Sequence, residues 1–195
     1  MLHWISENLP MWTYRSQSQI PKKAPPEGDF VLYAGHLPIS ALVNDGLYSR
    51  DQIDNVFSFT FVREPLSRVT SLFHQHVSSA KRKVATDIDS FIQQLWEQRD
   101  DPSWGTPALR LMAKPSSFWV HPVGGPSIRQ IYKLEEFEQA LLDLSARLAT
   151  PLKSKRMNLS RVVDGEKQVP SKKSVDLVIE IYADDYRNFG YSEPR

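Results

Sequence analysis

Two side chains that can bind an anion, Arg63 and Ser71, lie eight residues apart where a strand is predicted to run into a helix. Arg63 follows the apolar run VFSFTFV (56–62), and Ser71 stands about two turns into the helical pattern that begins near Pro65. A guanidinium group can hold a phosphate through two parallel hydrogen bonds. A helix N-terminus also attracts anions, because its first N–H groups have no partner within the helix. The junction is therefore a candidate anion site.

The same residues have simpler interpretations. Arg63 could cap a carbonyl group or pair with Glu64 or with an aspartate, and Ser71 could be a small residue at a helix contact. Arginines at strand ends are common. From the residue types alone, the anion site and these structural roles stay open as alternatives.

Strands and helices are expected to alternate along the chain and to position this junction. This alternation predicts a single α/β domain over 1–195, with a mostly parallel sheet flanked by helices. In open sheets of this kind ligands bind beyond the carboxyl ends of the strands, where Arg63 is expected. Residues 1–28 and the proline- and glycine-punctuated region 100–127 are expected to be irregular. The expected strands lie within 29–36, 56–62 and 127–133, and the expected helices within 65–77, 88–98 (with Asp87 as N-cap), 134–148 and 171–190.

The composition narrows the classes of function. The net charge of +1 gives the whole molecule no attraction to nucleic acid or to anionic membranes, so any anion binding must be local. The absence of cysteine excludes disulfides, thiolate metal sites and cysteine nucleophiles, and we expect no metal site. Because the start of the chain lacks a signal-peptide pattern and no run of about 18 apolar residues occurs, we expect a cytoplasmic protein without a membrane span.

The segment FTFVREPLSRVTSLF (59–73) resembles the signature of the PAPS-dependent sulfotransferases, especially the carbohydrate type that includes the heparan-sulfate 2-O-sulfotransferases. In that signature Arg-Asp-Pro follows a buried strand, and Glu64 replaces the aspartate here. The resemblance implies a P-loop-like sulfotransferase fold. It also implies that Arg63 and Ser71 bind the 3′-phosphate of 3′-phosphoadenosine 5′-phosphosulfate (PAPS), while Arg68 matches a second arginine with a more structural role.

Other segments resemble the same family in the same order, so that the resemblance covers about 29–191. YAGH (33–36) is similar to a Gly-His that ends a strand, and KPSSFWV (114–120) to a segment that usually reads Arg-Pro-Gln-Ser. IYKLEEFEQALLDL (131–144) is similar to a strand and helix that carry Tyr-Glu, and IYADDYRNFGY (181–191) to a common tyrosine-rich ending.

Sulfuryl transfer needs a base for the acceptor hydroxyl and stabilisation of the charge on the departing phosphate. His36 is the candidate base, because it ends a strand on the expected ligand side and a histidine in a similar place is regarded as the base in the related 2-O-sulfotransferases. A structural histidine in a loop is the alternative. His74 and His76 are expected to be solvated or packed, and His121 lies in the irregular region.

The first βα unit of the family is not recognisable. Its loop reads Ile-Pro-Lys-Thr-(Ala/Gly)-Gly-Thr-Ser and surrounds the 5′-phosphosulfate with N–H groups, whereas IPKKAPPEG (20–28) matches only the first letters. We therefore expect this unit to be incomplete or missing. Its loss would expose a sheet edge and remove N–H donors to the anion.

The sequence thus predicts a sulfotransferase that moves the sulfuryl group of PAPS to a hydroxyl of a carbohydrate-type acceptor. The alternative is a non-catalytic sulfotransferase-like protein that binds a 3′-phosphoadenosine nucleotide or a glycan. A kinase-like nucleotide-binding protein is disfavoured, because no G-x-x-x-x-G-K-[S/T] motif is present. We expect no nucleic-acid partner, and the sequence indicates neither the acceptor nor the oligomeric state.

Overall fold

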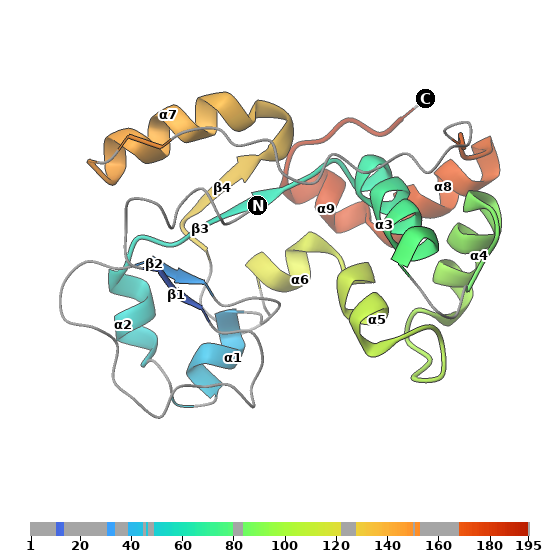
Figure 1. Ribbon diagram of the computed structural model, residues 1–195, viewed down its shortest axis with the longest axis horizontal. Coiled ribbons are helices and arrows are strands. Elements are labelled where there is room, and N and C mark those ends of the chain that lie inside the picture. Colours follow the sequence, from blue (N-terminus) through green and yellow to red (C-terminus); the bar gives the residue numbers. More distant parts are fainter. Residues whose placement is uncertain are drawn as a thin grey trace. The chain divides into compact units, whose positions relative to one another are not determined.

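A computed structural model describes residues 11–13, 31–33, 39–44, 46, 49–79, 84–121, 128–149, 151–152 and 168–194 of the chain (Figure 1). The elements in these ranges are mostly helices, with short strands between some of them, which confirms the α/β class. In chain order they are β1 (Met11–Thr13), β2 (Val31–Tyr33), α1 (Ile39–Asn44), α2 (Arg50–Asn55), β3 (Phe59–Val62), α3 (Pro65–Ser79), α4 (Ile88–Gln98), α5 (Pro107–Ala113), α6 (Ser116–Val120), β4 (Gln130–Lys133), a 3₁₀ turn (Leu134–Glu136), α7 (Phe137–Arg147), α8 (Lys172–Ile181) and α9 (Ala183–Asn188).

The described strands form two sheets of two strands each, not one larger parallel sheet. β1 and β2 are parallel, with Met11 opposite Val31 and Thr13 opposite Tyr33. β1 lies in the segment 1–28 that we expected to be irregular, so this expectation is wrong for its three residues. β3 pairs with β4. The finer prediction, a P-loop-like sulfotransferase fold, stays a prediction.

The region 100–127 was expected to be irregular, and this is wrong for two short helices, α5 and α6. The side chain of Thr106 accepts a hydrogen bond from the N–H of Leu109, and Pro107 is the first helical residue of α5. A proline is favourable there because the first N–H of a helix has no partner in any case. Prolines that suggested loops in the sequence therefore mark a helix start.

Two compact units divide the chain. The first unit comprises 1–61 and 118–158, and the second unit comprises 62–117 and 159–195. Each has an apolar cluster of its own, and the prediction of one domain stays a prediction. The cluster of the second unit contains Val69, Leu72, Phe73, Phe91, Ile92, Leu95, Leu109, Val178, Tyr182 and Tyr186, and that of the first contains Tyr132, Ala140, Leu141 and Leu144.

In the first unit, alternate side chains of β3 form an aromatic face. The ring centroids of Phe59 and Phe61 lie 6.4 Å and 5.5 Å from that of Tyr132 in β4, and Phe61 lies 5.4 Å from Phe137 at the start of α7. This spacing is the period of two expected of a strand with one packed face. β3 is thus fixed by the packing of its aromatic side chains, and Arg63 follows it directly in the sequence.

In the second unit, α3 buries Val69, Leu72 and Phe73 and lies beside α4, α5 and α8 (Figure 1). Pro65 is its first residue, as the sequence predicts. The predicted N-cap of α4 is also confirmed, because the Asp87 carboxylate accepts a hydrogen bond of 2.8 Å from the N–H of Ser90. Burial of each large apolar side chain contributes about 1.5–3 kcal/mol, so this packing fixes the direction of α3.

The C-terminal segment forms two helices, α8 and α9, where one helical stripe was predicted. The break is at Tyr182, whose φ of −116° and ψ of 26° leave the α-helical region. α9 ends at Gly190, as expected, with a φ of +61°. The N–H of Tyr191 donates to the carbonyl of Tyr186 at 3.0 Å, which is the Schellman arrangement that a left-handed glycine permits.

Candidate functional site at the start of α3

Arg63 lies directly between β3 and α3 and is half-buried. Its side chain makes no hydrogen bond, ion pair or ring contact with any residue that the structure describes. The alternatives of a carbonyl cap or a pair with Glu64 or an aspartate are therefore wrong for the described part of the chain. A guanidinium group without a counter-charge at a strand-to-helix junction is free to bind an external anion.

The carboxylate of Glu64 occupies the N-terminus of α3. One oxygen accepts from the N–H of Leu66 at 2.9 Å and from the hydroxyl of Tyr186 at 2.9 Å, and the other accepts from the N–H of Ser67 at 2.6 Å. The expected free N–H groups are thus partly taken by a residue of the chain itself. An anion at this junction must be held chiefly by side chains.

These contacts also set the charge of Glu64. Partial burial raises the pKa of its carboxyl group, but the hydrogen bonds from Ser67, Leu66 and Tyr186 together outweigh burial and leave the pKa below its ordinary value. Glu64 is therefore ionised at neutral pH. The negatively charged Glu64 is next to Arg63 in the sequence, but its carboxylate is bound to the N–H groups in the first turn of α3.

Ser71 is half-buried on α3, and its hydroxyl has no hydrogen-bond partner among the described residues. The helical period places it near the face of Ser67 and His74 and opposite the buried Val69 and Phe73. Arg63 and Ser71 therefore belong to the same unit and to the same strand-to-helix segment, as predicted. Their joint action on one anion stays a prediction.

The histidines are placed as follows. The predicted base His36 lies outside the described residues, as does the side chain of His76. The ring of His74 packs on Phe73, with centroids 5.3 Å apart, and its Nε2 is buried without a partner in the described structure. His121 is exposed.

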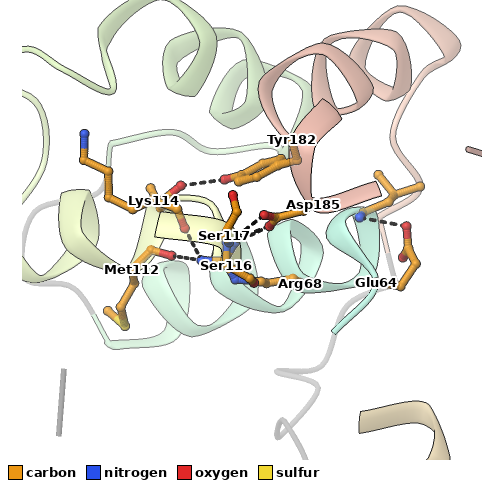
Figure 2. A network of polar contacts seen from close by, with 10 residues as sticks. Glu64, Arg68, Met112, Lys114, Ser116, Ser117, Tyr182 and Asp185 are labelled. Carbon is orange, nitrogen blue, oxygen red and sulfur yellow. Dashed lines mark hydrogen bonds and ion pairs between the residues drawn. The ribbon is translucent and has the colours of Figure 1, made fainter. Parts of the chain in front are cut away.

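Arg68 is held in a polar network inside the second unit (Figure 2). Its Nη2 donates to the carbonyl of Met112 at 2.7 Å and to the carbonyl of Lys114. Its Nη1 lies 3.8 Å from Oδ2 of Asp185, and its guanidinium carbon lies 5.5 Å from the ring centroid of Tyr182. These contacts are internal, so Arg68 ties α3 to two other segments.

Asp185 is the centre of the same network and is 1% exposed. Its two oxygens accept from the N–H groups of Ser116 at 2.6 Å and Ser117 at 2.8 Å, at the start of α6. Tyr182 donates to the carbonyl of Ala113 at 2.8 Å, and burial raises the pKa of its hydroxyl to about 12. The carboxylate thus caps one helix while it faces Arg68 from another.

Parts of three segments that the sequence singled out, 62–73, 114–117 and 181–191, therefore meet inside the second unit at the first turns of α3. The resemblance included Asp185 and Tyr186 in its tyrosine-rich ending but gave them no role, although both are buried and make the decisive contacts. The available signal was their spacing, because they follow the buried Tyr182 by three and four residues and so share its helix face.

A separate hollow of about 490 Å³ lies in the first unit between β4 and α7. Asp143 lines it, accepting from the hydroxyl of Tyr132 and from Nε of Arg147 at 2.8 Å. Burial, and then the carboxylate of Asp143, raises the pKa of Tyr132 to about 12. Asp143, Tyr132 and Arg147 thus already pair with one another at this hollow.

Two general features concern possible cofactors and membranes. No cluster of three or more His, Asp or Glu side chains that could hold a metal ion occurs within the described ranges. No helix in the part of the chain that the structure describes is long and apolar enough to cross a membrane.

Comparison of the chain with protein-family models, with curated proteins and with solved structures finds no significant match. Function is therefore argued from the residues of the site.

Proposed function

We propose that the chain is a PAPS-dependent sulfotransferase in which Arg63 and Ser71 bind the 3′-phosphate of PAPS. The observation that carries the proposal is the half-buried guanidinium of Arg63, which has no partner in the described structure although an ionised carboxylate, Glu64, is its neighbour in the chain. A phosphate dianion supplies the missing counter-charge, and the hydroxyl of Ser71 supplies a further donor.

The phosphate is favoured over other anions by two features. The resemblance of 59–73 to the sulfotransferase signature names the 3′-phosphate at these two positions. The rigid attachment of α3 through Arg68 and Asp185 supports the resemblance physically, because a site that binds a small anion needs a fixed geometry.

The proposed reaction is sulfuryl transfer to a hydroxyl of a carbohydrate acceptor. His36 would take the proton of that hydroxyl as its oxygen bonds to sulfur, and the bond from sulfur to the 5′-phosphate oxygen breaks. Adenosine 3′,5′-bisphosphate is the leaving group. In the proposal, Arg63 and Ser71 orient the nucleotide and do not touch the reacting atoms.

A second candidate is binding of the nucleotide without transfer. It is favoured by the sequence that follows Pro21-Lys22, which continues Lys-Ala-Pro-Pro-Glu where the family has Thr-(Ala/Gly)-Gly-Thr-Ser. Prolines have no N–H, so this segment offers fewer donors to a 5′-phosphosulfate. Both candidates use the same 3′-phosphate site.

The test is calorimetric titration with adenosine 3′,5′-bisphosphate and with adenosine 5′-monophosphate, which lacks the 3′-phosphate. The unmodified protein should bind the bisphosphate about 10- to 100-fold more tightly, because a charge-assisted contact contributes about 1.5–3 kcal/mol. Arg63→Ala should bring the two affinities together. Arg187→Ala, which removes an exposed arginine of α9 paired with Asp184, is the matched control and should preserve the preference.

Equal affinities in the unmodified protein, or a preference that survives Arg63→Ala, would refute the site. Transfer of labelled sulfate from PAPS to a panel of glycan acceptors separates the two candidates. Binding without transfer supports the non-catalytic one, and transfer that is unchanged by His36→Ala removes this histidine as the base.

A further inference from the structure

We propose that Tyr186 is a positioning residue of the nucleotide site, because its hydroxyl holds the Glu64 carboxylate away from Arg63 and so keeps Arg63 available for phosphate. This inference rests on the proposed function. It concerns a residue that does not touch the ligand and that acts through Glu64.

The carboxylate of Glu64 is held in one orientation by its hydrogen bonds. Both oxygens of Glu64 are engaged, one with Leu66 N–H and the Tyr186 hydroxyl and the other with Ser67 N–H. Arg63, the preceding residue, donates no hydrogen bond to this carboxylate and forms no ion pair with it. Adjacent side chains of opposite charge can form an ion pair at a surface. Here the carboxylate of Glu64 instead accepts hydrogen bonds from Leu66, Ser67 and Tyr186.

The carboxylate of Glu64 and the incoming phosphate compete for the guanidinium of Arg63. An ionised carboxylate that turned toward Arg63 would neutralise the guanidinium and would have to be displaced by the incoming phosphate. The ligand would then bind with an affinity reduced by the fraction of molecules in which Arg63 is paired. Any contact that keeps Glu64 on the helix start therefore favours binding.

Tyr186 is itself fixed by its packing and by the end of α9. Tyr186 is 3% exposed and packs in the apolar cluster of the second unit. Its carbonyl accepts from Tyr191 N–H at 3.0 Å beyond Gly190, so the end of α9 is closed around it. Burial and the neighbouring Glu64 raise the pKa of Tyr186, so its hydroxyl stays protonated and donates at neutral pH.

Tyr182 provides a matched control. It belongs to the same C-terminal segment, is equally buried and donates one hydrogen bond, but its acceptor is the carbonyl of Ala113. Tyr182→Phe and Tyr186→Phe therefore each remove one hydroxyl donor, from a buried and from a partly buried hydrogen bond respectively. Only Tyr186→Phe removes a hydrogen bond to the carboxylate beside Arg63.

The experiment measures the dissociation constant of adenosine 3′,5′-bisphosphate at neutral pH for four proteins. Tyr186→Phe should weaken binding about five- to tenfold, and Tyr182→Phe by less than about twofold, because only the former lets Glu64 pair with Arg63. Adding Glu64→Gln to Tyr186→Phe should restore the affinity, since a neutral amide cannot neutralise the guanidinium. A purely structural role predicts the opposite, because the double variant has lost more contacts.

Unchanged affinity in Tyr186→Phe, or a double variant as weak as Tyr186→Phe alone, would overturn the inference. If the unmodified protein does not bind the bisphosphate, the proposed function fails separately. The positioning is still decided in that case by ¹⁵N NMR of the Arg63 side chain. Its Nε–H signal should move in Tyr186→Phe and stay in place in Tyr182→Phe, and an unmoved signal in both would again refute the role.

Discussion

At the scale of single residues, the start of α3 is governed by one carboxylate. Glu64 accepts from Leu66 and Ser67 where a helix commonly has a serine, threonine, aspartate or asparagine cap. The longer side chain of glutamate also meets the Tyr186 hydroxyl. The N–H groups of Leu66 and Ser67 at the helix start are thereby occupied by Glu64. The selectivity of the junction for an external anion therefore depends on Arg63.

Glu64→Gln should destabilise the protein at neutral pH by about 1 kcal/mol, the usual worth of a helix cap. Because the pKa of Glu64 is lowered in the folded protein, its contribution is fully present above the ordinary value of 4.5 and is lost as the pH falls through the lower folded value. The free energies of unfolding of the two proteins in urea should therefore differ at pH 7 and converge once the pH falls below the lowered pKa of Glu64. A difference that persists in acid would show that Glu64 stabilises α3 through something other than its charge.

At the scale of elements, α8 and α9 hold the site together, since Asp185 meets Arg68 and Tyr186 meets Glu64 from the same short helix. The Arg68 and Asp185 side chains are 19% and 1% exposed. A pair buried to this degree contributes little relative to an apolar pair, but removal of one partner leaves an uncompensated charge.

Asp185→Ala should therefore cost about 3–5 kcal/mol, because Arg68 loses its counter-charge and the N–H groups of Ser116 and Ser117 lose their acceptor. Asp184→Ala is the control on the same turn. Asp184 is 67% exposed and pairs only with Arg187, so its removal should change stability by less than about 1 kcal/mol. Equal effects of the two substitutions in urea unfolding would contradict the buried network.

Gly190→Ala should cost about 1 kcal/mol, because an alanine at a φ of +61° is strained. The same change should loosen the closure of α9 between Tyr191 and Tyr186. Thermal unfolding checks the first effect, and faster hydrogen exchange of the Tyr191 amide checks the second. Unaltered stability would mean that the backbone there relaxes out of the left-handed region without loss.

The helices with regular apolar spacing, α3, α4 and α7, could be predicted from the sequence because their packing partners impose a period of 3.6 residues. α5 could not, because Thr106-Pro107 has the composition of a loop as well as that of a helix start. The burial of Asp185 could not be predicted for a related reason. An aspartate in an amphipathic stripe suggests solvent, and only Arg68, distant in the sequence, explains its burial.

At the scale of the whole molecule, the net charge of +1 means that ligand attraction must come from one place. Of the candidate site, the sequence predicted Arg63 and Ser71, because a strand end and a helix start can be recognised locally. It could not predict that Arg63 has no partner among the residues that the structure describes, since this depends on the contacts that Glu64 makes with Leu66 and Tyr186.

Binding should stabilise the second unit in particular. Adenosine 3′,5′-bisphosphate at about 100 times its dissociation constant should add about 2.7 kcal/mol to the free energy of unfolding and raise the melting temperature by roughly 5–10 °C. Hydrogen exchange should slow at the start of α3 and in α9, which share the Glu64–Tyr186 contact, and should change little in α7 of the first unit. Arg63→Ala should abolish both effects. Protection confined to α7 would instead place the ligand at the hollow between β4 and α7, where Asp143 pairs with Tyr132 and Arg147.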